Sequence, residues 1–431
     1  MNNIWLPIVK RSDIDICLFY VIKSIWELIL NGLQNQSLKQ PLPKEVSDIY
    51  DEKRYKDFIL YKKKYRNLSF IKMTIELICI FLILYSPFFH IVSKIQSIYI
   101  SLFICILFFF IVDLILSLIS EYYATFVIEE EFGMNKKTKR EFFKDFLLDQ
   151  IFELVFSFVI YTGIAFICKN ISKWTNGFSI SYIQSFMIVS GIGFCFYLIF
   201  ILFSYLSFLL LKQQYHFEPL KDQYLLNQIQ GLLKGCPKKV KDIMVYDESK
   251  KSTTKNAFVL KLPFYRMIGI ADNFINDNSY NECLGVLAHE AGHLKHKKKV
   301  YNYIFYLSLG FIFLFIVWLL PNASMLYKGI QWIDVSFDLV HPVYYLYFYI
   351  VSLIMDPFFY ILMVYKNYIT RKEEYEADEN VIKEGYQKEL IQLFKNLSKD
   401  ELVNVNPHPL IEFLEYDHPS MYHRIIALSN N

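Results

Sequence analysis

Glycine and proline are scarce in this sequence of 431 residues, with only 14 and 13 occurrences. Neither an internal repeat nor a low-complexity linker is present. The seven cysteines lack paired spacing, which argues against a disulfide framework and a cysteine-based metal site, so we expect free thiols. The formal net charge is only +3, and the basic residues lie in loops instead of one stripe, which argues against nucleic acid as a partner.

Apolar residues are what the sequence has in abundance. They make up 54% of the chain, aromatic residues alone make up 18%, and the mean hydropathy is +0.27. By length alone the chain would form two or three soluble domains, but this composition argues against that class. It predicts a polytopic membrane protein.

Six runs of about twenty apolar residues predict membrane-spanning helices. They lie at about 71–92, 98–120, 151–168, 186–211, 301–320 and 343–366. A seventh candidate at about 14–31 is interrupted by Lys23 and Glu27, and is either a first span or a helix lying at the membrane interface. It lacks the small-residue cleavage site of a signal peptide, so we expect it to remain in the protein. The predicted fold is therefore mainly α, with a seven-helix transmembrane bundle.

Lysine and arginine are distributed unequally between the two sides that these spans would separate. The segments 31–70, 121–150, 212–300 and 367–431 hold 36 of them, whereas 1–13, 93–97, 169–185 and 321–342 hold 6. Positive residues concentrate on the cytosolic side of membrane proteins. We therefore expect the four basic segments to lie in the cytosol.

Segment 212–300 is the one part with room for soluble structure. Its stretches 239–247 and 258–275 carry β-branched and aromatic residues between serine, asparagine and proline, which predicts a small β-hairpin flanked by helices. The chain thus divides into four parts: helices with cytosolic loops in 1–211, a cytosolic α+β segment in 212–300, two spans in 301–366 and a cytosolic C-terminal part in 367–431.

The stretch LGVLAHEAGHLKHKKK at 284–299 contains the pattern HExxH. Apolar residues recur through it at helical spacing, so His289 and His293 stand one turn apart on the same face of the predicted helix. Two imidazoles in this arrangement can bind one Zn²⁺, with Glu290 as the base that activates water. The pattern fixes only three positions, so a juxtamembrane helix with incidental histidines is the alternative. The two small residues before His293 favour the metal site, because they let another element approach.

A third ligand is expected from NYITRKEEYEADEN at 367–380, which follows the last span on the same side. Glu374 and Asp378 are four residues apart there, so one carboxylate can bind metal while the other orients a histidine ligand. Arg371, one turn earlier, is placed to pair with Asp378 or to hold a substrate carboxylate. A solvated charged helix is the alternative interpretation. His296 is a competing ligand, which we rank below Glu374 because it opens the basic run HKKK.

The lysines after His296 directly precede the span at 301–320. They are expected to anchor its cytosolic end and to contact anionic lipid headgroups. Membrane lipids are therefore predicted partners.

Together these residues resemble the Ste24-type CAAX prenyl proteases, integral-membrane zinc metalloproteases with the motifs HExxH and ExxAD. The similarity covers nearly the whole chain. YYATFVIEEEFGMNKKTKREFFKD (122–145) resembles a loop of this type, STTKNAFV (252–259) resembles the family's substrate-edge strand, and DHPSMYHR (417–424) follows in the expected order.

The resemblance implies a role for each matching residue. It implies one zinc ion with three protein ligands, His289, His293 and Glu374. Glu290 would be the general base, and Asn256 and His418 would contact the scissile peptide or its oxyanion. Arg371 and Asp378 would support them. The resemblance also implies a chamber enclosed by the spans.

The activity that the resemblance implies is removal of the three C-terminal residues of prenylated CAAX proteins or peptides. A prenylated cysteine partitions into lipid and exposes the following residues at the cytosolic interface, where the lysine run would place the HExxH helix. Residence in the endoplasmic reticulum membrane is expected by analogy.

Two other functions are consistent with the sequence. A membrane quality-control protease that cuts misfolded or translocon-stalled proteins would use the same chemistry, with prenyl specificity only secondary. A non-catalytic transporter or scaffold would instead use ionisable residues within the spans, such as Asp113 and Glu153. The presence of both Glu290 and Glu374 disfavours the second.

Overall fold

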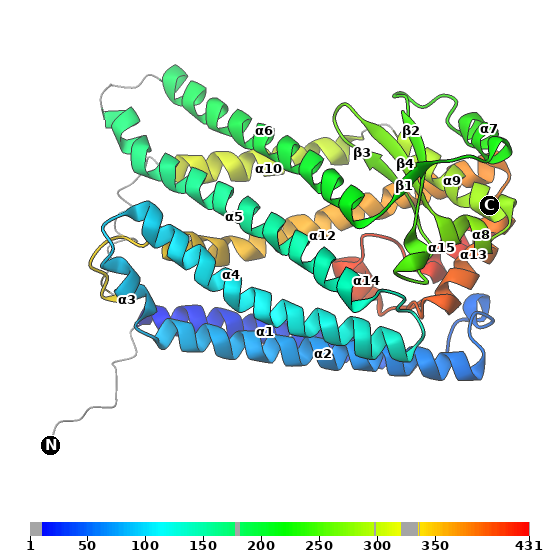
Figure 1. Ribbon diagram of the computed structural model, residues 1–431, viewed down its shortest axis with the longest axis horizontal. Helices are drawn as coiled ribbons and strands as arrows, with labels where there is room; N and C mark the ends of the chain where they lie inside the picture. The colour runs from blue at the N-terminus through cyan, green and yellow to red at the C-terminus, as the bar shows by residue number, and fades with distance from the viewer. Residues whose placement is uncertain (1–10, 177–181, 297–298, 320–334, 336, 431) are drawn as a thin grey trace.

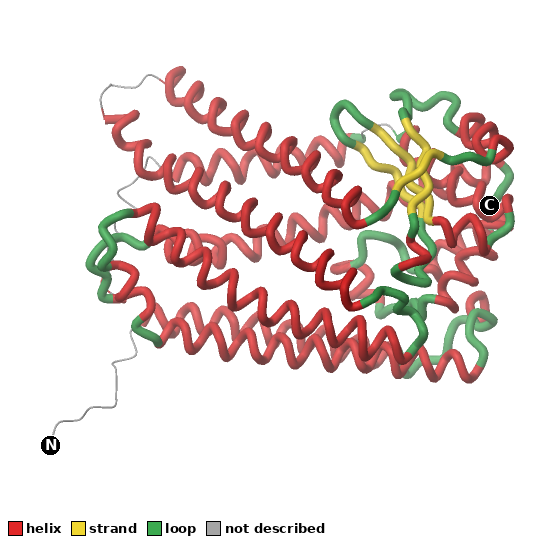
Figure 2. Tube along the Cα trace, viewed as in Figure 1, coloured by secondary structure: helices red, strands yellow, loops and turns green. Residues whose placement is uncertain are grey.

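The computed structural model of the chain describes residues 11–176, 182–296, 299–319, 335 and 337–430. Long helices that run side by side form one end of the molecule, and a small sheet with shorter helices forms the other (Figures 1 and 2). A mainly helical protein with a small α+β portion is the architecture that the sequence predicted.

The long helices carry the apolar runs of the sequence. They are α1 (Arg11–Ser37), α2 (Glu52–Tyr85), α4 (Ile98–Tyr123), α5 (Lys139–Asn176), α6 (Tyr182–Gln214), α10 (Val300–Leu319) and α12 (Tyr344–Glu384). The short α3 (Phe88–Ser93) joins α2 to α4, and a π-helical turn, η2 (Ala124–Glu129), continues α4. Large apolar side chains such as Leu82 and Phe200 are exposed on these helices, as expected for helices surrounded by lipid.

Among the described residues, four helices are long and apolar enough to cross a membrane. They are Glu52–Tyr85, Ile98–Glu129, Lys139–Ile167 and Gly193–Gln214. α12 is bent by 48° between Leu353 and Met355, and it adds a fifth span if its two parts cross together. The candidate at 14–31 lies within the helix α1. The end of the predicted span at 301–320 and parts of the predicted loops 169–185 and 321–342 lie outside the described residues.

The predicted span at 71–92 differs from the helix that contains it. α2 ends at Tyr85, because Pro87 has no amide hydrogen with which to continue a helix. At its other end α2 begins at Glu52, where the Asp51 side chain accepts a hydrogen bond from the amide of Arg54. The basic segment before the apolar run is therefore part of the same helix, which projects from the bundle to the sheet end (Figure 1).

A four-stranded sheet of order β1-β2-β4-β3 stands beside the bundle. Its strands are β1 (Phe217–Pro219), β2 (Asp242–Tyr246), β3 (Ala257–Lys261) and β4 (Arg266–Ala271). β3 and β4 form an antiparallel hairpin, but β2 pairs with β4 in parallel, so the prediction of a single hairpin was wrong. The residues of β4 are almost all buried, so its backbone groups need hydrogen-bond partners on both edges, and β2 and β3 supply them. In the order β1-β2-β4-β3, β3 is an edge strand of the sheet.

The helix α9 (Tyr280–Lys295) occupies the centre of the sheet end. It begins with a capping box, in which Ser279 and Glu282 exchange hydrogen bonds between side chain and backbone. Its apolar residues share one core with the strands and with neighbouring helices. The shorter helices at this end are α7 (Gln223–Leu232), α8 (Asp272–Asp277), α13 (Gln387–Asp400), α14 (Pro409–Glu415) and α15 (Met421–Ser429), with the 3-10 turns η1 (Lys44–Val46) and η3 (Glu248–Lys250).

α12 runs from the bundle into the sheet end as one long helix. The predicted boundary between a span and a separate acidic helix, at 366 and 367, lies inside it. α12 crosses α9 closely at Gly292, where an added Cβ would lie 2.8 Å from Cα of Ala377. Only glycine permits this approach, and it brings the HExxH segment of α9 against the acidic segment of α12.

Candidate metal centre

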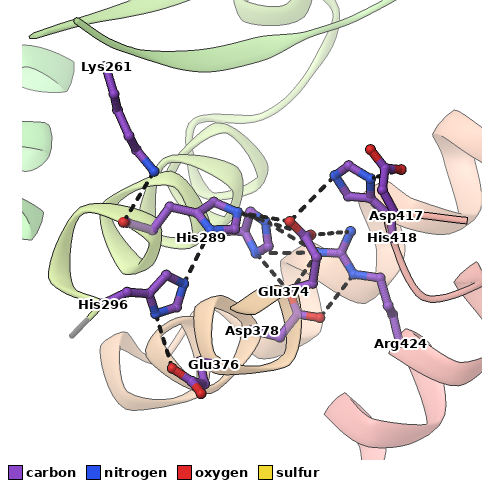
Figure 3. A network of polar contacts seen from close by, with 10 residues as sticks. Lys261, His289, His296, Glu374, Glu376, Asp378, Asp417, His418 and Arg424 are labelled. Carbon is purple, nitrogen blue, oxygen red and sulfur yellow. Dashed lines mark hydrogen bonds and ion pairs between the residues drawn. The ribbon is translucent and has the colours of Figure 1, made fainter. Parts of the chain in front are cut away.

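The crossing of α9 and α12 brings the predicted metal-binding side chains together. α9 presents His289 and His293 on one face, and α12 presents Glu374 to both (Figure 3). The two Nε2 atoms lie 3.1 Å apart, and the oxygens of Glu374 lie 3.3 Å from Nε2 of His289 and 3.0 Å from Nε2 of His293. Three potential ligand atoms therefore surround one small volume.

This arrangement fits a single metal ion. Ligand atoms at ~2.0–2.1 Å from a tetrahedral centre stand roughly 3.3 Å from one another, which is close to the separations found here. Oε2 of Glu374 is buried and has no partner in good hydrogen-bond geometry among the described residues, although Nε2 of His289 lies at 3.3 Å and Nη1 of Arg424 at 3.4 Å. With both histidines neutral, as metal binding requires, the carboxylates of Glu290, Glu374 and Asp378 outnumber the side-chain cations of Arg424 and Lys261, and a divalent cation would compensate the remaining negative charge.

The protonation of these groups depends on their mutual contacts. Burial alone would raise the pKa of Glu374, but the two histidines and Arg424 hold it well below its usual range. Burial and Arg424 oppose the charged form of His289, yet hydrogen bonds to Asp378 and Glu374 raise its pKa to about 9. Burial lowers the pKa of His293. At neutral pH the metal-free site therefore contains an ionised Glu374 and a protonated His289.

Asp378 stands behind His289 and is itself held by Arg424. Oδ1 of Asp378 lies 2.9 Å from Nδ1 of His289. Arg424 donates from Nε to Oδ2 at 2.9 Å and from Nη2 to Oδ1 at 2.7 Å, and both residues are buried. A neutral His289 that donates its Nδ1 hydrogen to Asp378 keeps a lone pair on Nε2 for a metal.

The sequence had not identified Arg424. It ends the segment DHPSMYHR, in which only the first histidine was assigned a role. On α15 it shares the buried face with Ile425 and Leu428. An arginine at a core position of an amphipathic helix is the signal that would have identified it, because a buried cation needs an anionic partner.

Arg371 lies away from the metal ligands. Its guanidinium donates to the carbonyl oxygens of Glu412, Phe413 and Tyr416 at the end of α14. It does not pair with Asp378, which had been one of its two predicted roles. The last carbonyls of a helix lack partners within the helix and attract a cation.

Of the two other predicted site residues, His418 lies beside a ligand, and Asn256 directly precedes the edge strand β3. His418 lies between α14 and α15, with Nε2 at 3.4 Å from Oε1 of Glu374 and Nδ1 at 2.8 Å from Oδ1 of Asp417. More than half of its side chain, 55%, is exposed. Asn256 is exposed directly before β3, and its carbonyl oxygen accepts a hydrogen bond from the amide of Ala271.

The edge strand β3 is fastened to the helix that carries the histidines. Nζ of Lys261, the last residue of β3, donates to the carbonyl oxygen of His293 at 3.3 Å.

Glu290 follows His289 on α9 and is partly buried, and this burial raises the pKa of its carboxyl group. A carboxylate with a raised pKa accepts a proton from water more readily than an ordinary one.

Two family models match consecutive parts of the chain. The model described as CAAX prenyl protease N-terminal, five membrane helices, matches residues 33–205. The model of peptidase family M48 matches residues 219–431, which contain all the groups described above.

Known relatives are similar over most of the chain. CAAX prenyl protease 1 of Saccharomyces cerevisiae is 28% identical over 330 residues, which cover 74% of this chain and 69% of that protein. The CAAX prenyl protease 1 homolog of Dictyostelium discoideum is 26% identical over 435 residues, which cover 96% of this chain and 95% of that protein. The crystal structure of S. mikatae Ste24p has the same fold, with a TM-score of 0.77 at 22% identity, and the match covers 96% of this chain and 98% of that one.

Proposed function

The chain belongs to the Ste24-type CAAX prenyl proteases of peptidase family M48, and from this premise we propose its substrate, its metal and its orientation. It is a metalloprotease that processes CAAX proteins, and its substrates are proteins or peptides with a prenylated CAAX terminus, from which it removes the last three residues. The observation that carries the proposal is the cluster of His289, His293 and Glu374, whose two histidines lie on a helix that Lys261 of the edge strand β3 contacts at the carbonyl oxygen of His293.

The metal is one zinc ion, held by the two histidines and the glutamate. When bound, it polarises a peptide carbonyl and makes water more acidic. Glu290 takes the proton of the attacking water and later delivers it to the leaving amine. His418, which meets Glu374 from the exposed side, donates a hydrogen bond to the oxyanion that develops on the scissile carbonyl. Asp378 keeps His289 in the tautomer that binds metal.

The substrate peptide binds along the edge strand β3. An extended chain can add to a free sheet edge through backbone hydrogen bonds, which makes few demands on side chains. Asn256, which directly precedes β3, contacts the peptide next to the scissile bond. Arg371 supports the site indirectly, because it holds the end of α14 and thereby the segment that carries His418.

The membrane setting suits a lipid-modified substrate. α12 enters the site directly from the bundle, and α10 begins soon after α9 ends, so the ligands stand where the bundle meets the sheet end (Figure 1). α1 and α10 complete seven crossing helices around a chamber, and lipids contact the lysine run. The four segments rich in lysine and arginine face the cytosol, and the protein resides in the endoplasmic reticulum membrane.

The test is hydrolysis of a farnesylated CAAX peptide by the detergent-purified protein, beside the same peptide without the farnesyl group, each with and without a chelator. We expect chelator-sensitive release of the last three residues, much faster from the farnesylated peptide. Glu290→Gln should keep the metal and lose hydrolysis. Equal cutting of both peptides would favour the quality-control protease, and no cutting of either by folded, zinc-loaded protein would contradict the proposal.

A further inference from the structure

The two histidine ligands have different partners on the sides away from the metal position. Nδ1 of His289 meets the carboxylate of Asp378, whereas Nδ1 of His293 lies 3.2 Å from Nε2 of His296. His296 directly follows the last residue of α9, at the point where the backbone leaves the helix. From the sequence it was a competing ligand. In the structure it stands behind His293 and outside the group of ligand atoms.

His296 is backed in turn by a carboxylate. Its Nδ1 lies 3.3 Å from Oε2 of Glu376 on α12 (Figure 3). The other oxygen of Glu376 accepts a hydrogen bond from the Tyr301 hydroxyl at 3.3 Å and pairs with the ammonium of Lys299. The side chains of His296 and Glu376 are only 14% and 24% exposed. A line of contacts thus runs from His293 to the beginning of α10.

One arrangement of hydrogens along this line lets His293 bind metal through Nε2. That nitrogen must present a lone pair, so the ring hydrogen is on Nδ1 and is donated to Nε2 of His296. His296 accepts it with its own hydrogen on Nδ1, from which it donates to Glu376. An ionised Glu376, held by Lys299 and Tyr301, completes the sequence of donors and acceptors.

We propose that His296 and Glu376 are positioning residues that hold the ring of His293 in the tautomer and orientation needed to bind metal. The inference rests on the metal site proposed above and assigns it two further residues. Outer partners of metal-binding histidines contribute about 10–100-fold to metal affinity. Since Lys299 and Tyr301 hold Glu376, the second ligand is also tied to the start of α10, a helix of the bundle.

The experiment measures zinc retention by the full-length protein in detergent, through transfer of zinc to a chromophoric chelator. His296→Ala removes the acceptor and should weaken zinc binding about 10–100-fold. His296→Gln offers an amide oxygen to His293 and an amide donor to Glu376, so it should bind zinc almost as tightly as the unaltered protein. Glu376→Ala should fall between the two. His216→Ala is the matched control, because this histidine is 70% exposed and pairs with Glu218, and it should change nothing.

The outcomes separate positioning from packing. Thermal unfolding of the metal-free proteins should be alike for His296→Ala and His296→Gln, while their zinc retention differs. Zinc retention by His296→Ala equal to that of the unaltered protein would overturn the inference, and so would an equal loss in His296→Gln. If the unaltered, folded protein binds no zinc, the proposed metal site itself fails, and this inference fails with it.

Discussion

His289 shows what the metal centre demands of a single side chain. Asp378 and Glu374 favour its protonated form strongly enough to outweigh burial and the nearby Arg424. Metal binding requires the neutral ring, so protons and metal compete for this residue. The lowered pKa of His293 leaves the other histidine neutral and ready to bind.

The competition predicts a pH dependence for metal uptake. The metal-free His289 has a pKa of about 9, so at pH 7 its ring carries a proton that the metal must displace. Uptake near pH 7 should release about one proton per ion, and the apparent affinity should rise roughly tenfold per pH unit until the pH passes this pKa. Calorimetry in buffers with different ionisation enthalpies counts the protons. Uptake without proton release at pH 7 would show that His289 is neutral in the metal-free protein.

Arg424 is predicted to stabilise both the fold and the ligand geometry. Arg424→Ala leaves the buried carboxylate of Asp378 without its guanidinium partner and beside the imidazole of His289 alone, which should cost about 3–5 kcal/mol of unfolding free energy. Arg424→Lys should recover only part of this, because an ammonium cannot bridge both carboxylate oxygens as the guanidinium does. Thermal unfolding measures the loss of stability. Arg140→Ala is the control, because the side chain of Arg140 is exposed.

A second variant tests whether the effect comes from the pair. Adding Asp378→Ala to Arg424→Ala removes the uncompensated charge, so the double variant should lose less stability than the two single losses together. Strictly additive losses would show that Asp378 and Arg424 act independently.

At the scale of single residues, the sequence could identify side chains that local spacing places on one face of a helix. HExxH places two histidines on one helical turn, and the separation of Glu374 and Asp378 places two carboxylates on one face. The partners of Asp378 and His296, which are Arg424 and Glu376, could not be found in this way. They depend on how α15 and α12 return to α9, which no local pattern contains.

At the scale of elements, the sequence predicts where the helices lie, but not where they end or which strands pair. Hydropathy locates the apolar runs, but α2 ends at Tyr85, shortly before Pro87, and α12 continues far beyond its run. The number of apolar residues determines neither of these helix ends. The parallel pairing of β2 with β4 is equally invisible to local patterns, because β3 lies between them in the sequence.

The crossing of α9 and α12 predicts a strong effect of one methyl group. In Gly292→Ala the added Cβ would meet backbone atoms of Ala377, and overpacking of this kind costs about 1–3 kcal/mol. The two helices must separate, which should also weaken metal binding, since each contributes ligands. Thermal unfolding and zinc retention measure the two effects.

Gly231→Ala is the matched control for this prediction. Gly231 lies in the helix α7, and an added Cβ there would meet nothing within 4 Å. Alanine should therefore stabilise the protein by about 0.4–1 kcal/mol. Equal behaviour of the two glycine variants would show that the helix crossing tolerates a larger separation.

At the scale of the whole molecule, α1 is the element that the sequence left between two interpretations. The lysine that interrupts its apolar run, Lys23, lies 3.0 Å from the carboxylate of Asp356 on α12. The hydroxyls of Tyr20 and Tyr349 are also hydrogen-bonded, at 2.5 Å. In the sequence, the charge of Lys23 argues against a membrane-spanning helix. In the structure, a residue 333 positions away compensates this charge. Such compensation favours packing of α1 inside the bundle, because ionisable residues within membranes pair with one another.

Charge exchange between α1 and α12 tests this placement. Lys23→Asp or Asp356→Lys alone brings like charges together, and each should lower stability by roughly 1–2 kcal/mol, less than for a buried pair because both side chains are half exposed. The double variant restores opposite charges and should recover most of the loss. Lys56→Glu on the exposed pair with Glu52 should change little, since both side chains are well solvated. Thermal unfolding of the detergent-purified proteins measures all four. A double variant as unstable as the sum of the single changes would mean that α1 does not depend on Asp356, and its apolar run would then be better explained by a helix lying at the membrane interface.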